Sequence, residues 1–267
     1  MPAMPRDATA RYLRAAADAA VEAGALLARH IGRPRTVRTK RSAIDLVTEI
    51  DRRAERLIQR RLRAAAPRFG FLGEERGERD AGAEARWIVD PLDGTNNFVH
   101  GMPLFGVSIA LEVRGRMAAG VIYDPMRREL FTAARGRGAR LNGRPIRVST
   151  TARLAASLLS TGFSSAFLRQ DEPYLGWFKA AQRHSHGVRR IGSTVISLAS
   201  IAAGRMEGFY ERDLWPWDIA AGMLLLQEAG GRVTNFEGRP VALTEGHVIA
   251  TNGRIHPALL RLLRSAQ

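Results

Sequence analysis

The sequence predicts an α+β half over residues 1–149 and an α/β half over residues 150–267. In the first half, two amphipathic helical patterns precede three strand-like runs that only short turns separate, which is typical of helices packed on an antiparallel sheet. In the second half, short apolar runs alternate with helical patterns, which is typical of strands joined by helices. With 267 residues, the chain is long enough to bury a sizeable core.

Two helices are expected before the sheet. Over residues 9–31 apolar residues recur at helical spacing, Asp7 or Thr9 is expected to cap this helix, and Gly32 is expected to end it. Thr48 is expected to cap the second helix, because Asp51 stands at the third helical position, as in a capping box. On this reasoning Asp51 is an acid favoured by the helix dipole.

Strands are expected on both sides of residue 150. In the first half they cover residues 69–72, 87–89, 105–113, 117–123 and 129–133, with a loop at 76–86 and a hairpin turn at Asn142-Gly143. In the second half, strands at 158–161, 188–191, 207–210 and 248–251 alternate with helices at 172–183, 194–203, 216–229 and 257–263.

The stretch of residues 87–100 holds the most chemistry. An apolar, β-branched run leads to Asp90, and Pro91 is expected to end the strand there, because proline has no N–H for the ladder. Asp93 follows closely, and we expect both carboxylates on the same side of an extended backbone. Thr95 can cap whatever helix follows, so that two acids stand beside free N–H groups. Such a place suits hard cations and a phosphate.

An alternative is that Asp90-Pro91 and Asp93-Gly94 form two ordinary turns, because both pairs are common in turns. Other acids in similar positions argue against it. Glu74 follows the predicted strand at 69–72, and Asp218 stands in the first turn of a predicted helix. The sequence therefore favours a shared acidic site.

Composition limits the partners. The formal net charge of +15 raises nucleic acid as a partner. The basic residues are almost all arginine, however, and they are spread along the chain, so we expect an arginine bias on solvated faces and no nucleic-acid partner. Apolar runs stay well short of the roughly 20 residues that span a bilayer. The start of the chain lacks the apolar centre of a signal peptide, and without cysteine there are no disulfides or thiol ligands. We expect a cytoplasmic protein that binds no membrane.

Taken together, these motifs resemble the inositol monophosphatase family of magnesium-dependent phosphatases. Its first signature matches residues 87–100, and its second matches residues 217–222 with Gly230-Gly231. Further matches are residues 45–51, 73–75 and 192–194 and Glu211. All the matches stand in the same order as in the family. The matches span nearly the whole chain, which makes the combination far more specific than a lone glycine motif. The resemblance implies a layered α-β-α-β-α sandwich with the site between the two halves.

The resemblance also implies roles for single residues. The implied metal ligands are Glu74, Asp90, the backbone carbonyl of Leu92, Asp93 and Asp218. The implied catalytic residues are Glu74 and Thr95, which position the attacking water, and Asp51, which holds the Thr95 hydroxyl. The implied substrate contacts are Asp93, Gly94, Thr95, Gly192, Ser193, Thr194, Glu211 and Asp218. The cofactor would be Mg²⁺, as two or three ions, with sensitivity to lithium.

Elementary chemistry agrees with an oxygen-ligated metal, because four clustered carboxylates repel one another strongly unless cations neutralise them. Two of the implied roles keep an alternative. Lys40 matches a basic residue near the family's site, but a solvated loop lysine explains it equally well. Glu211 could instead be an exposed acid paired with Arg212.

The expected activity is Mg²⁺-dependent hydrolysis of a phosphate monoester, foremost myo-inositol monophosphate, by a homodimer. Residues 96–101 favour the bacterial inositol-1-monophosphatases within the family. Histidinol-phosphate, fructose-1,6-bisphosphate or NADP phosphatase activity on the same fold is the alternative. From another class, a basic RNA- or protein-binding regulator could retain such a site without using it.

Overall fold

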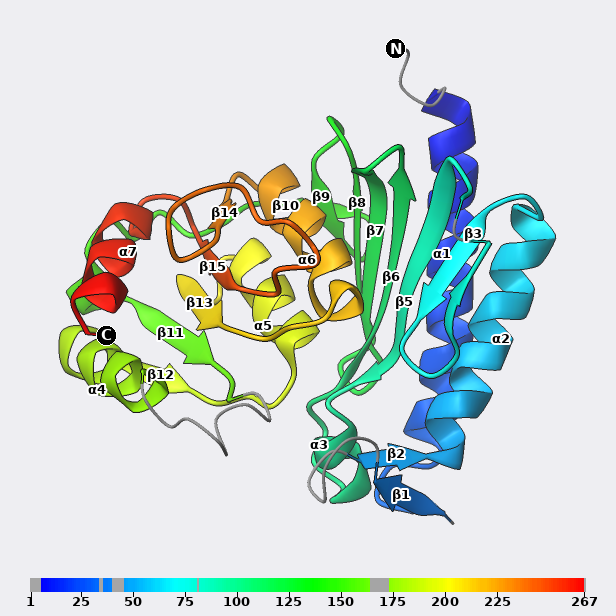
Figure 1. Cartoon of the computed structure of the whole chain (residues 1–267), viewed down its shortest axis with the longest axis horizontal. Coiled ribbons are helices and arrows are strands. Elements are labelled where there is room, and N and C mark those ends of the chain that lie inside the picture. Colours follow the sequence, from blue (N-terminus) through cyan, green and yellow to red (C-terminus); the bar gives the residue numbers. More distant parts are fainter. Residues whose placement is uncertain (1–5, 34–35, 40–45, 81, 164–172, 267) are drawn as a thin grey trace.

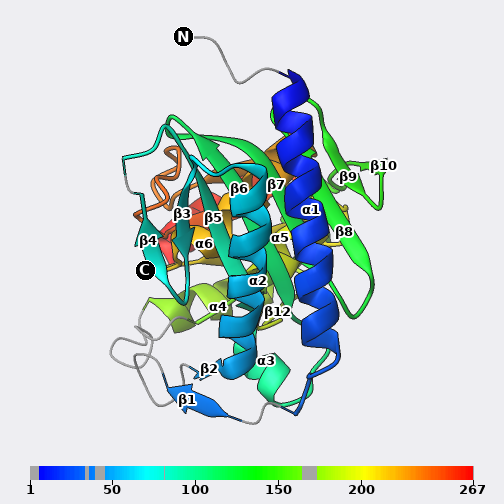
Figure 2. The same cartoon turned by 90° about the vertical axis from the view of Figure 1, so that its right-hand side faces the viewer.

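Five layers, α-β-α-β-α, make up the fold of this computed structural model, which describes residues 6–33, 36–39, 46–80, 82–163 and 173–266 (Figure 1). The layering that the resemblance implied is thus confirmed. The outer layer consists of α1 (Arg6–Ala28) and α2 (Glu49–Ala65), which lie side by side on one face of an eight-stranded sheet (Figure 2). The central layer consists of α5 (Thr194–Ala202) and α6 (Pro216–Glu228). The last layer consists of α4 (Tyr174–His184) and α7 (His256–Ser265), packed on a five-stranded sheet.

The two sheets divide the strands by sequence. The larger sheet has the order β10-β9-β8-β7-β6-β5-β3-β4, and all neighbours pair antiparallel except β3 and β5. Its strands are β3 (Gly70–Gly73), β4 (Gly77–Arg79), β5 (Ala85–Asp93), β6 (Gly106–Val113), β7 (Arg116–Asp124), β8 (Glu129–Ala134), β9 (Ala139–Leu141) and β10 (Arg144–Ile146). The smaller sheet has the order β12-β11-β13-β15-β14. Its strands are β11 (Leu158–Thr161), β12 (Gly187–Arg189), β13 (Gly208–Glu211), β14 (Arg232–Thr234) and β15 (Val248–Thr251).

Four short elements complete the described chain. Strands β1 (Val37–Thr39) and β2 (Leu46–Thr48) pair antiparallel, and the helix α3 (Thr95–Val99) follows β5 directly. A 3₁₀ turn, η1 (Leu154–Ala156), leads into β11. Within the described ranges, no helix is long and apolar enough to cross a membrane.

Helix starts were predicted with mixed success. The capping box of α2 is confirmed, since the Thr48 side chain accepts from the N–H of Asp51 and the Asp51 carboxylate accepts from the N–H of Thr48 over 3.0 Å. The predicted caps of α1 were wrong, because α1 begins at Arg6 and both Asp7 and Thr9 lie inside it. A helix tolerates acids in its first turn, so Asp7 stabilises the helix end without being its cap.

The prediction that Pro91 ends a strand at Asp90 was wrong. Strand β5 continues to Asp93, and its register against β6 shifts between Asp90 and Asp93. Pairing with β3 ends at Val89, so Pro91 stands where the ladder requires no N–H from it. The expectation that an extended backbone by itself places both carboxylates on the same side was also wrong, because residues three apart face opposite sides of a regular strand. The irregularity is therefore what allows Asp90 and Asp93 to act on one site.

The position of α5 and α6 between the two sheets explains why their sequences are so apolar. Both sheets contribute to one hydrophobic cluster around them, with Ala110 from the larger sheet and Val248 from the smaller, both fully buried. A helix between two sheets has no solvated face, so its pattern is apolar all round. This core connects the two halves, and it holds the carboxyl end of β5 close to the start of α6.

Two further loop predictions met different outcomes. The region predicted as a loop at 76–86 contains β4, which pairs with β3. The predicted hairpin at Asn142-Gly143 is confirmed between β9 and β10, and both residues have positive φ, at 48° and 80°.

Candidate active site

Three acids predicted as metal ligands lie together. One oxygen from each of Asp90, Asp93 and Asp218 lies within 4.8 Å of the other two. The first two come from the end of β5, and Asp218 comes from the first turn of α6. Three carboxylates at this separation repel one another unless cations neutralise them. An all-oxygen donor set suits a hard divalent cation such as Mg²⁺, so the residues present fit the metal that the family resemblance implies.

Hydrogen bonds hold each of these carboxylates in place. Oδ1 of Asp90 accepts from the N–H of Leu92 over 2.9 Å. Oδ2 of Asp93 accepts from the hydroxyl of Ser193 and from the N–H of Val195, both at the start of α5. Oδ2 of Asp218 accepts from the N–H of Trp215 over 2.7 Å. These carboxylates are thus oriented by β5 itself and by residues at the starts of α5 and α6.

Burial dominates the electrostatics of the cluster. It raises the pKa of Asp93 to about 6, although the hydrogen bonds from Ser193 and Val195 act in the opposite direction. Burial and then the charges of Asp93 and Glu74 raise the pKa of Asp218 well above its usual range. A nearby cation would reverse these shifts, because it favours the charged carboxylates.

Glu74 faces the same cluster from the end of β3. It lines the same pocket as Asp93 and Asp218, and its N–H donates to the carbonyl of Val89 on β5 over 3.3 Å. Behind it lies Glu55 of α2, which the sequence did not indicate. Oε1 of Glu55 accepts from the N–H of Glu75 over 3.1 Å, and burial raises the pKa of Glu55 to about 7.

Thr95 and Asp51 contact each other as the resemblance implied. The Thr95 hydroxyl lies 3.2 Å from Oδ1 of Asp51 and 3.1 Å from the carbonyl oxygen of Leu92, and it can donate to either. Asp51 is fully buried, and its other oxygen accepts from Thr48. Thr95 is the first residue of α3 and not its cap, because Gly94 with φ of 94° takes that position. A Cβ at Gly94 would lie 2.9 Å from the carbonyl oxygen of Leu104, so the close approach requires glycine.

A cavity of about 540 Å³ lies where the two halves meet. Its lining includes Glu74, Asp93 and Asp218 together with the predicted substrate contacts Gly192, Ser193, Thr194 and Glu211. Glu211 is only 8% exposed and accepts from the Thr194 hydroxyl over 3.4 Å, which excludes the alternative of an exposed surface acid. Burial, and then the charge of Asp93, raises the pKa of Glu211 to about 8.

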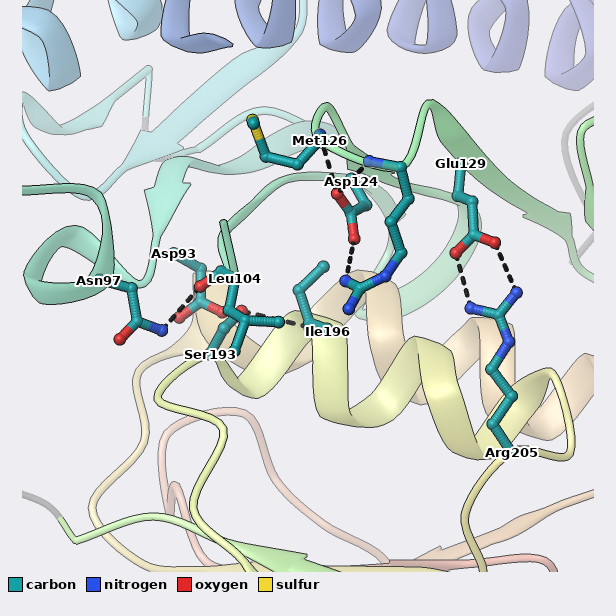
Figure 3. A network of polar contacts seen from close by, with 10 residues as sticks. Asp93, Asn97, Leu104, Asp124, Met126, Glu129, Ser193, Ile196 and Arg205 are labelled. Carbon is teal, nitrogen blue, oxygen red and sulfur yellow. Dashed lines mark hydrogen bonds and ion pairs between the residues drawn. The ribbon is translucent and has the colours of Figure 1, made fainter. Parts of the chain in front are cut away.

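Asn97 connects two segments of the site, and sequence reasoning did not identify it. Its Nδ2 donates to the carbonyl of Leu104 over 2.7 Å (Figure 3). The same Nδ2 donates to the carbonyl of Ile191 over 2.9 Å. These bonds join the α3 segment to the loop of Gly192–Thr194, which carries predicted substrate contacts. Asn97 stands inside the first signature, but no local signal relates it to Ile191, which is 94 residues away.

Two predictions lie outside the described residues. These are Lys40, the basic residue expected near the site, and Asp45, the first residue of the matched segment 45–51.

Comparison with known proteins agrees with this geometry. A profile of the inositol monophosphatase family matches residues 9–267. The chain is 45% identical over 258 residues to Nus factor SuhB of Pseudomonas aeruginosa, covering 94% of this chain and 95% of that protein. It is 42% identical over 259 residues to inositol-1-monophosphatase of Mesorhizobium japonicum, covering 96% and 97%. Among solved structures, extragenic suppressor protein suhB from Bartonella henselae shares 43% identity at a TM-score of 0.90, covering 95% and 98% of the two chains. The chain therefore belongs to the inositol monophosphatase family, a family of phosphatases.

Proposed function

We propose that the protein is a Mg²⁺-dependent phosphomonoesterase whose preferred substrate is myo-inositol monophosphate. The observation that carries this proposal is the cluster of Asp90, Asp93 and Asp218 at one end of the cavity, with Glu74 beside it. We propose Glu74, Asp90, Asp93, Asp218 and the Leu92 carbonyl as the metal ligands. Bound cations would neutralise the phosphate, lower the pKa of the attacking water and stabilise the leaving oxygen.

The residues of the chain would position the reactants. The Thr95 hydroxyl donates its proton to Asp51 or Leu92, so its lone pairs are left to accept a hydrogen bond from the attacking water. Glu74 is the carboxylate placed to accept the proton that this water loses. The water oxygen attacks phosphorus while the ester bond to the alcohol breaks, and the alcohol takes up a proton as it leaves. The N–H groups of Gly94 and Thr95 would bind the phosphate.

The alcohol would be recognised by the wall of the cavity that the second half of the chain forms. Glu211 and Thr194 form a buried, hydrogen-bonded pair there, and such groups discriminate against phosphate esters whose alcohol carries no further hydroxyls. Gly192 and Ser193 lie in the same loop. The same wall also suits the alternatives of histidinol phosphate, fructose 1,6-bisphosphate and NADP. We propose that the protein acts in the cytoplasm as a homodimer, by analogy with the family.

A substrate panel tests the proposal. Phosphate release is measured at fixed Mg²⁺ from myo-inositol 1-phosphate, histidinol phosphate, fructose 1,6-bisphosphate and NADP, each with and without a chelator. We expect the highest kcat/KM for the inositol ester, and loss of activity with the chelator. A higher kcat/KM for another ester would reassign the alcohol, and activity that survives the chelator would refute the role of the metal. The Asp218→Asn variant is the control for contaminating phosphatases.

A further inference from the structure

Helix α2 exposes a nearly uniform arginine surface. Its exposed residues are Arg52, Arg53, Arg56, Arg60, Arg61, Arg63 and Ala64. Two of the three acids of this helix, Asp51 and Glu55, are fully buried. The third, Glu49, is half-buried in the first turn and accepts from the N–H of Thr36, so the exposed residues of the helix include no acid. Arginines that are separated in the sequence by apolar core positions are therefore gathered on one face of the outer layer (Figure 2).

Four of these arginines form a single row, which we name the arginine stripe: Arg53, Arg56, Arg60 and Arg63. At about 100° per residue they fall within an arc of about 80°, and they extend over about 15 Å of the helix axis. Neighbours in the stripe are three or four residues apart, or about 4.5–6 Å along the axis. Like charges at this spacing destabilise a helix by a few tenths of a kcal/mol per pair.

The stripe is distinct from the arginines that form ion pairs. Arg61 pairs with Glu22 of α1 over 2.6 Å, and Arg52 lies 3.8 Å from Glu75. Within the part of the chain that the structure describes, no hydrogen bond or ion pair joins a side chain of the stripe to a carboxylate. Arg60 is close enough to Glu22 to lower the pKa of that carboxyl, but Glu22 is already occupied by Arg61. The stripe thus presents concentrated positive charge to solvent.

We propose that the arginine stripe binds the phosphate backbone of a nucleic-acid duplex, in contrast to the expectation from the sequence that nucleic acid is not a partner. Guanidinium groups bind phosphate oxygens with good geometry, and a linear row of them matches a linear row of phosphates. The exposed residues of α2 include no aromatic side chain to stack on a base and no amide to read a base edge. Binding is therefore independent of base sequence and favours the regular backbone of a duplex over a single strand. This function does not rest on the proposed phosphatase activity.

The salt dependence of binding tests the proposal. A fluorescent RNA duplex of about 20 base pairs is titrated with the protein from about 50 to about 200 mM salt. The test variant is R53Q/R56Q/R60Q/R63Q. Each lost phosphate contact lowers the slope of log K against log salt by about 0.9, so we expect a slope less steep by about 3–4 in the test variant. A scrambled duplex and a DNA duplex should bind with similar affinity.

A second quadruple variant separates direct contact from net charge. This variant changes four exposed arginines elsewhere on the molecule: Arg116, Arg128, Arg137 and Arg144. They lie on β7 to β10 or the turns between them, whereas α2 packs on β5 of the same sheet. Replacing all four with glutamine changes the net charge equally but should alter the slope by less than about 1. Equal effects of the two quadruple variants, dependence on one base sequence, or no binding by the unmodified protein at the lowest salt would each overturn the proposal. Circular dichroism and phosphate release show that both variants remain folded.

Discussion

The hydroxyl of Thr95 lies 3.2 Å from Oδ1 of Asp51, although 44 residues separate them in the sequence. The other oxygen of Asp51 accepts from the N–H of Thr48 and so forms part of the cap of α2. One buried carboxylate thus joins the start of α2 to the start of α3. It serves both as the helix-start acid that the capping pattern indicated and as the partner of Thr95 that the family resemblance implied.

The first prediction follows from this shared carboxylate. Thr95→Ala and Asp51→Asn should each lower kcat by about 100-fold or more, because both disturb the orientation of the same hydroxyl. The double variant should lose little beyond either single variant, since residues that act as a unit give non-additive losses. Ser185→Ala is the control, because the Ser185 hydroxyl donates to the carbonyl of Ala181 and accepts from the N–H of Gly187. It should reduce the stability by about 1 kcal/mol while leaving kcat within about twofold. Losses that multiply would show that Thr95 and Asp51 act separately.

The second prediction concerns the acid cluster. Asp90→Asn should reduce turnover by orders of magnitude, yet the metal-free protein should be at least as stable as before, because one repelling charge is removed. The stabilisation that added Mg²⁺ gives in thermal unfolding should shrink, since it depends on metal affinity. Asp124→Asn is the control, because Asp124 is a buried acid that pairs with Arg127 over 2.7 Å (Figure 3). It should lower the stability and keep the response to Mg²⁺; the same response to Mg²⁺ in Asp90→Asn would refute the ligand assignment.

The third prediction tests whether Glu211 binds the hydroxyls of the substrate's alcohol. Glu211→Gln keeps an oxygen to accept from Thr194, so the fold of the cavity wall should survive. The kcat/KM for inositol monophosphate should fall at least 10-fold, whereas that for an aryl phosphate without hydroxyls should change little. Glu237→Gln, at an exposed acid, is the control and should leave both values unchanged. Equal losses on the two substrates in Glu211→Gln would show that Glu211 does not contact the alcohol.

The fourth prediction concerns stability against pH. His256 is 1% exposed, its ring nitrogens lie 2.9 Å from the hydroxyls of Thr234 and Thr251, and burial lowers its pKa to about 4. The unfolded chain takes up a proton on this histidine near pH 6.5, whereas the folded protein does so only near pH 4. Its contribution is thus complete above about pH 6.5, and the free energy of unfolding falls by up to about 3 kcal/mol as the pH drops toward 4.

Urea unfolding at several pH values measures this contribution. In the His256→Gln variant, which keeps a donor and an acceptor for the two threonines, the difference in stability from the unmodified protein should shrink as the pH falls. His184 is exposed, so His184→Gln should retain the full pH dependence. A parallel pH profile in His256→Gln and the unmodified protein would contradict the assignment.

Much of the fold could be predicted because it depends on short-range patterns. Strands β11 and β15 have the predicted bounds, and the cap of α2 depends only on the spacing of Thr48 and Asp51. The largely apolar sequence of α6 likewise reflects its place between two sheets. The predictions failed where contacts with residues far away in the sequence override the preference of a local segment. Pro91 remains in a strand because β3 no longer pairs beside it and the register with β6 shifts there.

The sequence by itself determined the chemistry of the site: which acids stand at element ends, the glycines beside them and the family to which the chain belongs. Tertiary structure alone decided which of these groups meet. Asp218 contacts a cluster from β5 more than 100 residues earlier, and Asn97 reaches Ile191 across 94 residues. Residues that appeared scattered, such as Arg53 and Arg63, became one charged stripe only when α2 packed its apolar side on β5. The physical reason is that helix and strand preferences act over a few residues, whereas the burial of apolar faces between layers decides which distant elements come into contact.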